Sequence, residues 1–239
     1  MLKEGKVVCV VPVYNESDLI VHTVEGLKKI KYIDEIVVVN DGSKDDTLEV
    51  INGLNVKVIN LEKNYGKGYA MRKAIDTLEY DYIGFIDGDL GDTSIEAESL
   101  FLPVINGEAD VSIAKFKKRS TMTDTKGGIG LVKGLAKKGI YFFTKKEIDT
   151  GLSGQRVYTK EVIKKMDYIP DRYGIEVAMT IQTLNGGFSI VEVPVTMKHR
   201  YSQRNLQGTI HRGKQFYDIL KTFIIMYFRR WKIELYYIN

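Results

Sequence analysis

The stretch Tyr82-Ile83-Gly84-Phe85-Ile86-Asp87-Gly88-Asp89 decides the fold class, because an apolar run leads directly into two carboxylates. Such a run predicts a buried strand that delivers Asp87 and Asp89 to its carboxyl end. In open α/β sheets, ligands bind at that end of the strands. Two carboxylates separated by Gly88 offer hard oxygen ligands to one Mg²⁺ or Mn²⁺ ion, and the glycine lets a diphosphate approach closely. The alternative is an ordinary acidic turn, since Asp and Gly are common turn residues.

Three strand-and-helix units precede this stretch. Apolar runs at 6–13, 33–40 and 56–61 predict strands, and helical patterns at 18–29, 47–53 and from the turn at 64–68 to about 78 predict the helices between them. Four strands alternating with helices in under 90 residues predict a mostly parallel sheet with right-handed crossovers. We therefore expect an α/β fold whose first half binds a nucleotide.

Length and composition indicate a globular protein. The 239 residues are 44% hydrophobic and 28% charged, which is enough to bury a sizeable core. The single cysteine, Cys9, lies inside an apolar run, so the chain has no disulfide framework and no thiolate cluster for zinc. The first six residues are too polar for a signal peptide, and no stretch approaches the roughly 18 apolar residues that span a bilayer. We expect a cytoplasmic protein, with a peripheral position at the inner face of the membrane as an option.

The carboxyl-terminal segment carries the excess of positive charge. Residues 198–239 hold nine Lys or Arg and two acidic residues, a net charge of +7, although the whole chain carries only +4. Apolar residues recur at helical spacing from 213 to about 234, and we expect one amphipathic helix within the segment 213–239. Either this helix lies on a membrane surface, where Trp231 and the cations around it suit the interface, or it packs on its own domain or on the second subunit of a homodimer.

Polar turns follow the four predicted strands, and parallel strands end at one shared edge of the sheet. These turns are Tyr14-Asn15-Glu16, Asp41-Gly42-Ser43, Asn64-Tyr65-Gly66-Lys67-Gly68 and Asp87-Gly88-Asp89. The Asp41 carboxylate can accept a hydrogen bond from a uracil or guanine imino N–H. A helix start at Gly66-Lys67-Gly68 offers backbone N–H groups and a cation to a phosphate. The chain has neither a Walker A pattern nor GxGxxG, so a P-loop NTPase and a dinucleotide dehydrogenase are not supported.

The four turns resemble the motifs of the family 2 glycosyltransferases of the GT-A fold. The matching segments occur in the family's order over about the first 95 residues: VVPVYNE at 10–16, VNDGS at 39–43 followed by Asp46-Thr47, NYGKG at 64–68, and IDGD at 86–89. The resemblance implies one GT-A domain with a Rossmann-like sheet, in which residues 1–95 bind the nucleotide sugar and residues 96–212 bind the acceptor. The donor would be a nucleotide-diphosphate sugar of the UDP or GDP type. The predicted donor-binding residues are Pro12, Tyr14, Glu16, Asp41, Lys67, Asp87, Gly88 and Arg200.

The second half resembles two branches of the family more loosely. The segments LSGQR at 152–156, GIE at 174–176 and VEVPV at 191–195 resemble polyprenyl- and dolichyl-phosphate sugar synthases and soluble enzymes akin to glucosyl-3-phosphoglycerate synthase. His199 resembles the histidine that completes the metal site in the second branch, so the predicted ligands of Mn²⁺ or Mg²⁺ are Asp87, Asp89 and His199. A lone histidine is otherwise usually structural or exposed. Gly91 stands where the polyprenyl branch commonly has a glutamine.

The predicted function is metal-dependent transfer of a hexose to an acceptor in the synthesis of a cell-envelope or storage glycan. A hydroxyl acceptor needs a base, for which Asp92, Asp149 and Glu176 are the candidates, whereas a phosphate acceptor, including a lipid-linked one, needs none. A nucleotidyltransferase would carry a Gly-rich basic loop after its first strand, unlike the Tyr14-Asn15-Glu16-Ser17 turn. A non-catalytic module that binds a sugar nucleotide remains the third alternative. We expect no nucleic-acid partner.

Overall fold

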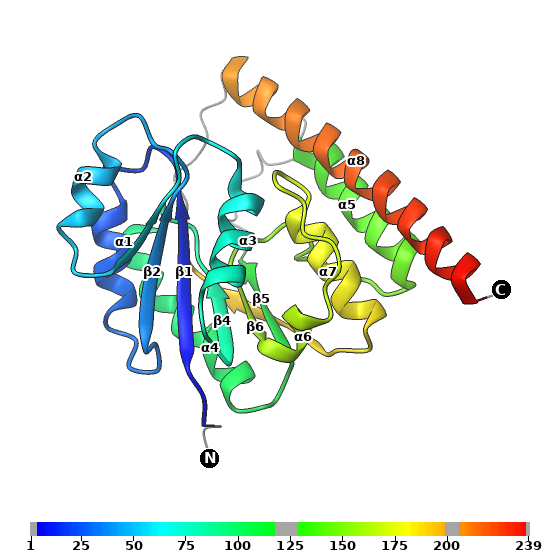
Figure 1. The fold of residues 1–239 in the computed structure, drawn as a ribbon, viewed down its shortest axis with the longest axis horizontal. Coiled ribbons are helices and arrows are strands. Elements are labelled where there is room, and N and C mark those ends of the chain that lie inside the picture. The colour runs from blue at the N-terminus through cyan, green and yellow to red at the C-terminus, as the bar shows by residue number, and fades with distance from the viewer. Residues whose placement is uncertain (1–3, 118–128, 199–205, 238–239) are drawn as a thin grey trace.

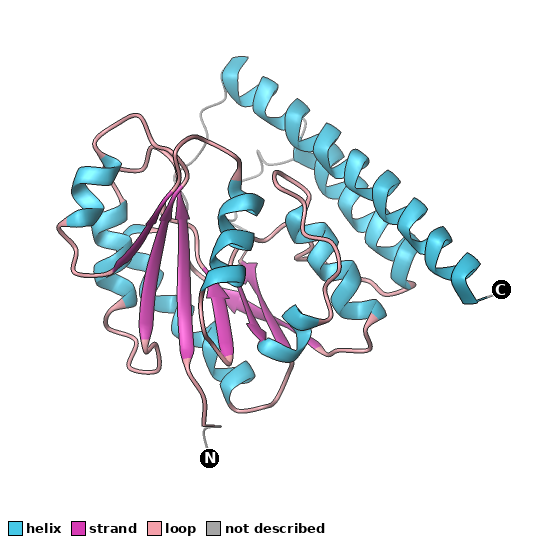
Figure 2. Cartoon of the chain, viewed as in Figure 1, coloured by secondary structure: helices cyan, strands magenta, loops and turns pink. Residues whose placement is uncertain are grey.

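The computed structural model describes residues 4–117, 129–198 and 206–237. One seven-stranded sheet with the strand order β3-β2-β1-β4-β6-β5-β7 forms the centre, and helices cover both of its faces (Figures 1 and 2). The strands are β1 Val7–Val13, β2 Glu35–Asn40, β3 Lys57–Asn60, β4 Tyr82–Phe85, β5 Val111–Phe116, β6 Arg156–Thr159 and β7 Ile190–Val195. The helices are α1 Ile20–Leu27, α2 Thr47–Asn52, α3 Lys67–Thr77, the 3₁₀ helix η1 Gly91–Ala97, α4 Glu98–Ile105, α5 Ile129–Thr144, α6 Lys160–Lys164, α7 Ile175–Asn185 and α8 Leu206–Tyr237.

The first four strands pair as the sequence predicts. Strand β1 lies between β2 and β4 and is parallel to both, and β3 is parallel to β2. The side chains of β1 alternate between the two faces, with Cys9 and Val11 in one core cluster and Val8 and Val10 in the other. Helices α1 and α4 cover the first cluster, and α3 and α7 cover the second. Complete burial raises the pKa of the Cys9 thiol, which makes it a packing residue.

Strand β6 is antiparallel to both of its neighbours, β4 and β5, which the sequence pattern did not predict. The pairing sets Arg156 opposite Phe85. Residues that precede β6 therefore lie beside the residues that follow β4. This register brings the segment around Gln155 next to Asp87.

A third core cluster joins α5, α7 and α8. Helix α8 begins at Leu206, earlier than the predicted start at 213, and lies along α5 (Figure 1). Its Ile219, Phe223 and Met226 are buried, so one side of α8 packs on its own domain. No helix in the described parts of the chain is long and apolar enough to cross a membrane.

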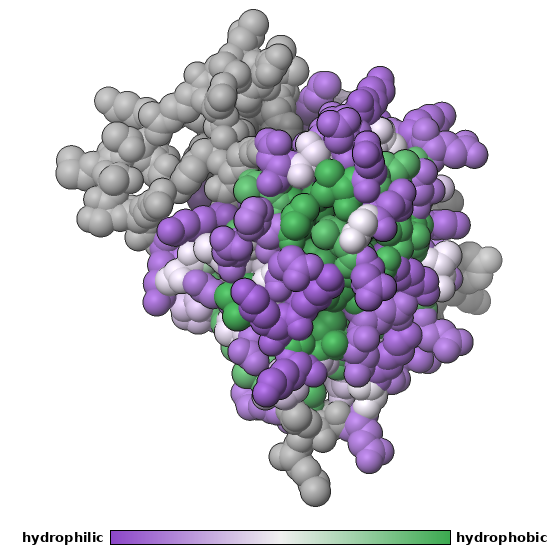
Figure 3. All heavy atoms as spheres, turned by 90° about the vertical axis from the view of Figure 1, so that its left-hand side faces the viewer, coloured by the Kyte–Doolittle hydropathy of each residue, from purple (hydrophilic) through white to green (hydrophobic). Residues whose placement is uncertain are grey.

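The opposite end of the molecule carries α2 and the edge strand β3. Figure 3 shows this face, where hydrophobic surface is bordered by hydrophilic side chains. Apolar residues of α2, β3 and the segment between them pack against the core and are only partly buried, among them Leu48, Leu54 and Val58. This edge lies away from the α5, α7 and α8 cluster.

Candidate active site

A pocket of about 530 Å³ opens at the carboxyl ends of β1, β2 and β4. The described residues that line it are Pro12, Val13, Tyr14, Glu16, Asp41, Asn64, Gly66, Lys67, Asp87, Gly88, Asp89, Arg172 and Tyr173. All four predicted turns contribute to it. The convergence that parallel strands predict is thus present in the structure.

Asp41 fixes the second and third turns to each other. Its Oδ1 accepts a hydrogen bond from the backbone N–H of Tyr65 and its Oδ2 accepts one from Gly66, both at 2.8 Å. Burial raises the pKa of Asp41, and the two backbone N–H groups partly oppose that rise. Each carboxylate oxygen has a second lone pair, so Asp41 keeps the capacity to accept from a ligand in the pocket.

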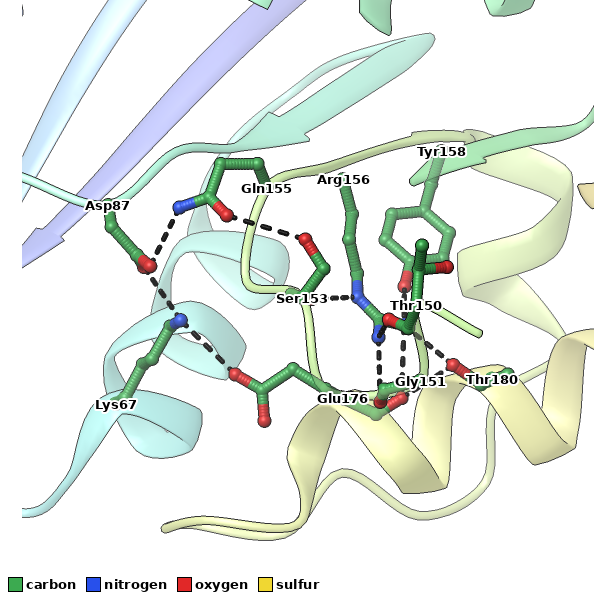
Figure 4. Close-up of polar contacts among 10 residues, drawn as sticks. All are labelled: Lys67, Asp87, Thr150, Gly151, Ser153, Gln155, Arg156, Tyr158, Glu176 and Thr180. Atoms are coloured by element: carbon green, nitrogen blue, oxygen red, sulfur yellow. Dashed lines mark hydrogen bonds and ion pairs between the residues drawn. The ribbon is translucent and has the colours of Figure 1, made fainter. Parts of the chain in front are cut away.

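Lys67 links two carboxylates at the floor of the site (Figure 4). Its Nζ lies 2.7 Å from Asp87 Oδ1 and 3.1 Å from Glu176 Oε1. Gln155 Nε2 donates to the other Asp87 oxygen at 2.7 Å. Burial alone would lower the pKa of Lys67, but the attraction of Asp87 and Glu176 outweighs it and raises the pKa. Lys67 is therefore a charged group held at a fixed place beside Asp87.

Arg156 holds in place the two segments that carry Gln155 and Glu176 (Figure 4). The side chain is fully buried, and its guanidinium donates to the carbonyl oxygens of Thr150, Gly151, Ser153 and Glu176 and to the hydroxyls of Tyr158 and Thr180. These groups belong to the 150–153 turn, to β6 and to the first turns of α7. One buried cation thus fixes the two segments that carry Gln155 and Glu176.

Gly154 lies directly against the Lys67–Asp87 pair. A Cβ atom at this position would collide with Lys67 Nζ and would lie 2.7 Å from Asp87 Oδ2. Both groups end flexible side chains, so we expect Gly154→Ala to fold but to displace the Lys67–Asp87 pair, lowering kcat/KM for the donor roughly tenfold or more. Gly134→Ala is the control, because a Cβ there meets nothing within 4 Å. Equal steady-state kinetics for the two variants would contradict the prediction.

The segment before α7 supplies two pocket residues that sequence reasoning missed, Arg172 and Tyr173. It packs on the start of α3, where Tyr69 N donates to Asp171 O at 2.9 Å and a Cβ at Gly68 would collide with Pro170 O. No periodicity or motif connects these distant segments. Gln155 lies in the 152–156 segment, whose resemblance to the family could have marked it as a site residue.

The predicted donor-binding residues Pro12, Tyr14, Glu16, Asp41, Lys67, Asp87 and Gly88 all line the pocket, whereas Arg200 lies outside the described residues. Among the candidate bases, only Glu176 reaches the cluster, through Lys67. Asp92 pairs with His22 at 3.2 Å on the surface, and Asp149 binds Lys115 at 3.0 Å and Lys137 at 3.4 Å. Neither Asp92 nor Asp149 is among the residues found to line the pocket. Their catalytic roles stay predictions.

The side chains at the predicted metal site fit a divalent cation in part. Asp87 and Asp89 line the same pocket and offer the hard oxygen ligands that Mg²⁺ and Mn²⁺ accept. The described part of the chain contains no group of three His, Cys, Asp or Glu arranged to hold a metal ion. The predicted third ligand, His199, lies outside the described residues.

The sheet order and the mixed pairing around β6 are those of the GT-A fold. The sequence model described as Glycosyl transferase family 2 matches residues 8–167. The chain belongs to that family and is a glycosyltransferase.

Similar structures and relatives agree with this assignment. Glucosyl-3-phosphoglycerate synthase from Mycobacterium tuberculosis, in complex with Mn²⁺, UDP and phosphoglyceric acid, matches with a TM-score of 0.73 at 21% identity, covering 91% of this chain and 78% of that one. The same enzyme with Mg²⁺ and UDP matches with a TM-score of 0.72 at 22% identity, covering 91% and 77%.

Two relatives differ in how much of their length the chain spans. An uncharacterized protein of Methanocaldococcus jannaschii is 29% identical over 209 residues, which are 80% of this chain and 88% of the relative. The bactoprenol glucosyl transferase of Shigella phage SfX is 31% identical over 180 residues, which are 70% of this chain. The matched region is only 56% of the phage protein's length.

Proposed function

We propose that the protein transfers a hexose from a UDP-sugar to an acceptor that carries a phosphate. The observation that carries this proposal is the single pocket that brings Asp41, Lys67, Asp87 and Asp89 together. The family membership supports sugar transfer, and the UDP bound in the similar structures supports a uridine donor. GDP-type donors remain the alternative.

Different pocket residues would bind different parts of the sugar nucleotide, according to their charge. Asp41 suits the imino N–H of the base, because an ionised carboxylate is an acceptor only. Lys67 and Arg172 are the cations on the pocket wall that can meet the diphosphate. A divalent cation held by Asp87 and Asp89, with the predicted help of His199, would neutralise the negative charge that develops on the departing diphosphate.

A phosphate acceptor agrees with the positions of the candidate bases. A phosphate oxygen is already ionised at neutral pH, so the transfer needs no carboxylate to remove a proton. Asp92 pairs with His22, Asp149 pairs with Lys115, and Glu176 is held by Lys67. Glu176 would then orient Lys67. A lipid-linked phosphate is favoured by the bactoprenol glucosyl transferase relative, and a small phosphorylated acid by the phosphoglycerate enzyme.

A thermal-shift panel tests the donor site. UDP-, GDP-, TDP- and ADP-sugars are each added with Mn²⁺, Mg²⁺ or a chelator to the wild type and to Asp89→Ala. We expect a rise in Tm with a UDP-sugar that needs the metal and is lost in Asp89→Ala, because binding to the folded state alone stabilises it. A metal-independent rise that Asp89→Ala retains would reject the metal site.

Product analysis then identifies the acceptor. Radiolabelled UDP-glucose is incubated with a polyprenyl phosphate or with phosphoglyceric acid, and the products are separated by solvent extraction. We expect label to move to the organic phase with the lipid acceptor. Donor binding without transfer or hydrolysis would instead favour the non-catalytic binding module.

A further inference from the structure

Of the nine large hydrophobic side chains that are exposed on the described parts of α5 and α8, six form one stripe on each helix. They are Leu131 (72% exposed) and Phe142 (54%) on α5, and Tyr217 (65%), Leu220 (41%), Ile224 (50%) and Phe228 (64%) on α8. We call this set the α5–α8 face. Scattered single apolar residues need no explanation, but a contiguous exposed patch indicates an interaction site.

The six residues lie on two helices that pack on each other. Helix α8 buries Phe223 against α5, where the ring stacks on Phe143 with centroids 5.8 Å apart and a Cβ at Gly139 would collide with it. Tyr217, Leu220, Ile224 and Phe228 follow spacings of three, four and four residues, which makes them one stripe along α8. At 100° per residue this stripe lies on the side of α8 away from the buried Ile219, Phe223 and Met226. Leu131 and Phe142 are three helical turns apart, so they share one side of α5.

Helices α5 and α8 lie side by side and run in the same direction (Figure 1). Both begin near the end of the molecule to which the parallel strands point, and α8 lies along α5 (Figure 1). The candidate active-site pocket opens at the carboxyl ends of those strands. A partner bound along the α5–α8 face would therefore extend toward the pocket end of the molecule.

Positive charge borders the α5–α8 face. Exposed Lys138 and Lys145 lie on the α5 side, and exposed Lys214 and Lys221 lie on the α8 side, each pair seven residues apart. Lys145 Nζ lies 5.6 Å from the centre of the Phe142 ring. Helix α5 contains no acidic residue, and Asp218 is the one acidic residue between 213 and 229. The border is thus complementary to an anionic surface.

We propose that the α5–α8 face docks on an anionic membrane surface, with both helices lying in the plane of the lipid headgroups. Aromatic and aliphatic side chains bordered by lysines are what an interfacial helix presents to such a surface. A second copy of this chain is the less favourable occupant, because a twofold contact through this face would set lysine borders of like charge close together. The inference concerns binding and holds whichever acceptor the site uses.

Vesicle co-sedimentation of the full chain, without donor or acceptor, tests the proposal. We expect the wild type to sediment with phosphatidylcholine vesicles that contain phosphatidylglycerol. It should bind pure phosphatidylcholine vesicles about tenfold more weakly, because each lysine near a negatively charged surface adds favourable binding free energy. The triple variant Tyr217→Ser, Ile224→Ser, Phe228→Ser should bind the anionic vesicles at least about tenfold more weakly than the wild type does. Ile95→Ser, which changes a 41% exposed residue on η1, should bind like the wild type.

Two further measurements separate loss of membrane binding from loss of the fold and test the role of the lysines. Circular dichroism and Tm establish that the triple variant is folded, and replacing Lys138, Lys145, Lys214 and Lys221 with Gln should remove the preference for anionic vesicles. Wild-type protein that stays in the supernatant with both vesicles would overturn the proposal. So would a wild-type dimer, seen by sedimentation velocity, that the triple variant converts to a monomer, because the face would then be a subunit interface. Failure here with intact transfer activity would leave the proposed function standing.

Discussion

An Asp87→Asn variant is expected to keep its fold and to lose donor-dependent activity by a factor on the order of 10² to 10³, the size associated with removing one charge-stabilising group from an active site. Asp87 is the centre of the polar cluster, bound by Lys67 at 2.7 Å and by Gln155 at 2.7 Å. The amide has the shape of the carboxylate but no charge, so it would bind a divalent cation poorly and leave Lys67 with Glu176 as its remaining carboxylate partner.

Steady-state kinetics with the UDP-sugar and Mn²⁺ measure this effect, and urea unfolding shows whether the fold is intact. Asp76→Asn is the matched control, because Asp76 is an exposed carboxylate on α3, the helix that also carries Lys67. We expect the control to stay within about twofold of the wild type, as surface changes away from such sites usually do. An Asp87→Asn enzyme with unchanged kcat/KM would remove Asp87 from the proposed metal and diphosphate site.

Arg156→Met is expected to lower the free energy of unfolding by about 3–5 kcal/mol, the cost of removing one partner from a buried charged network. The guanidinium serves six oxygen atoms, four of them backbone carbonyls, at 2.6 to 3.4 Å. Methionine fills similar volume but donates no hydrogen bond, so each of these buried acceptors would lose one donor. Arg156→Lys should fall between the two, because one ammonium has three donors and no fork.

Urea denaturation followed by circular dichroism gives this free energy from the midpoint and slope of the transition. Lys160→Met is the control, since Lys160 is 39% exposed and lies 3.9 Å from Asp81, a geometry worth about 0–1 kcal/mol. If Arg156→Met were as stable as the wild type, the desolvation of the guanidinium would be offsetting all six hydrogen bonds. The network would then serve only to position Gln155 and Glu176.

The sequence by itself determined the parallel half of the sheet and most of the lining of the candidate active-site pocket. The run from Tyr82 to Asp89 encodes both a buried strand and the carboxylates that follow it, because apolar periodicity and a polar turn lie in consecutive residues. Parallel strands end at one edge, so the turns at Tyr14, Asp41 and Lys67 had to meet Asp87 there. The amphipathic pattern likewise predicted α8, although it placed the start later than Leu206.

Only the tertiary structure decided which distant residues complete the site. The antiparallel insertion of β6 beside β4 brings Gln155 to Asp87, and the packing of the 170–173 segment on α3 brings Arg172 to the pocket. It also paired Lys67 with Glu176, Asp92 with His22, and Asp149 with Lys115 and Lys137. These contacts join residues far apart in the chain and depend on which strand edge and helix face remain to be covered. Local periodicity carries no information about that choice.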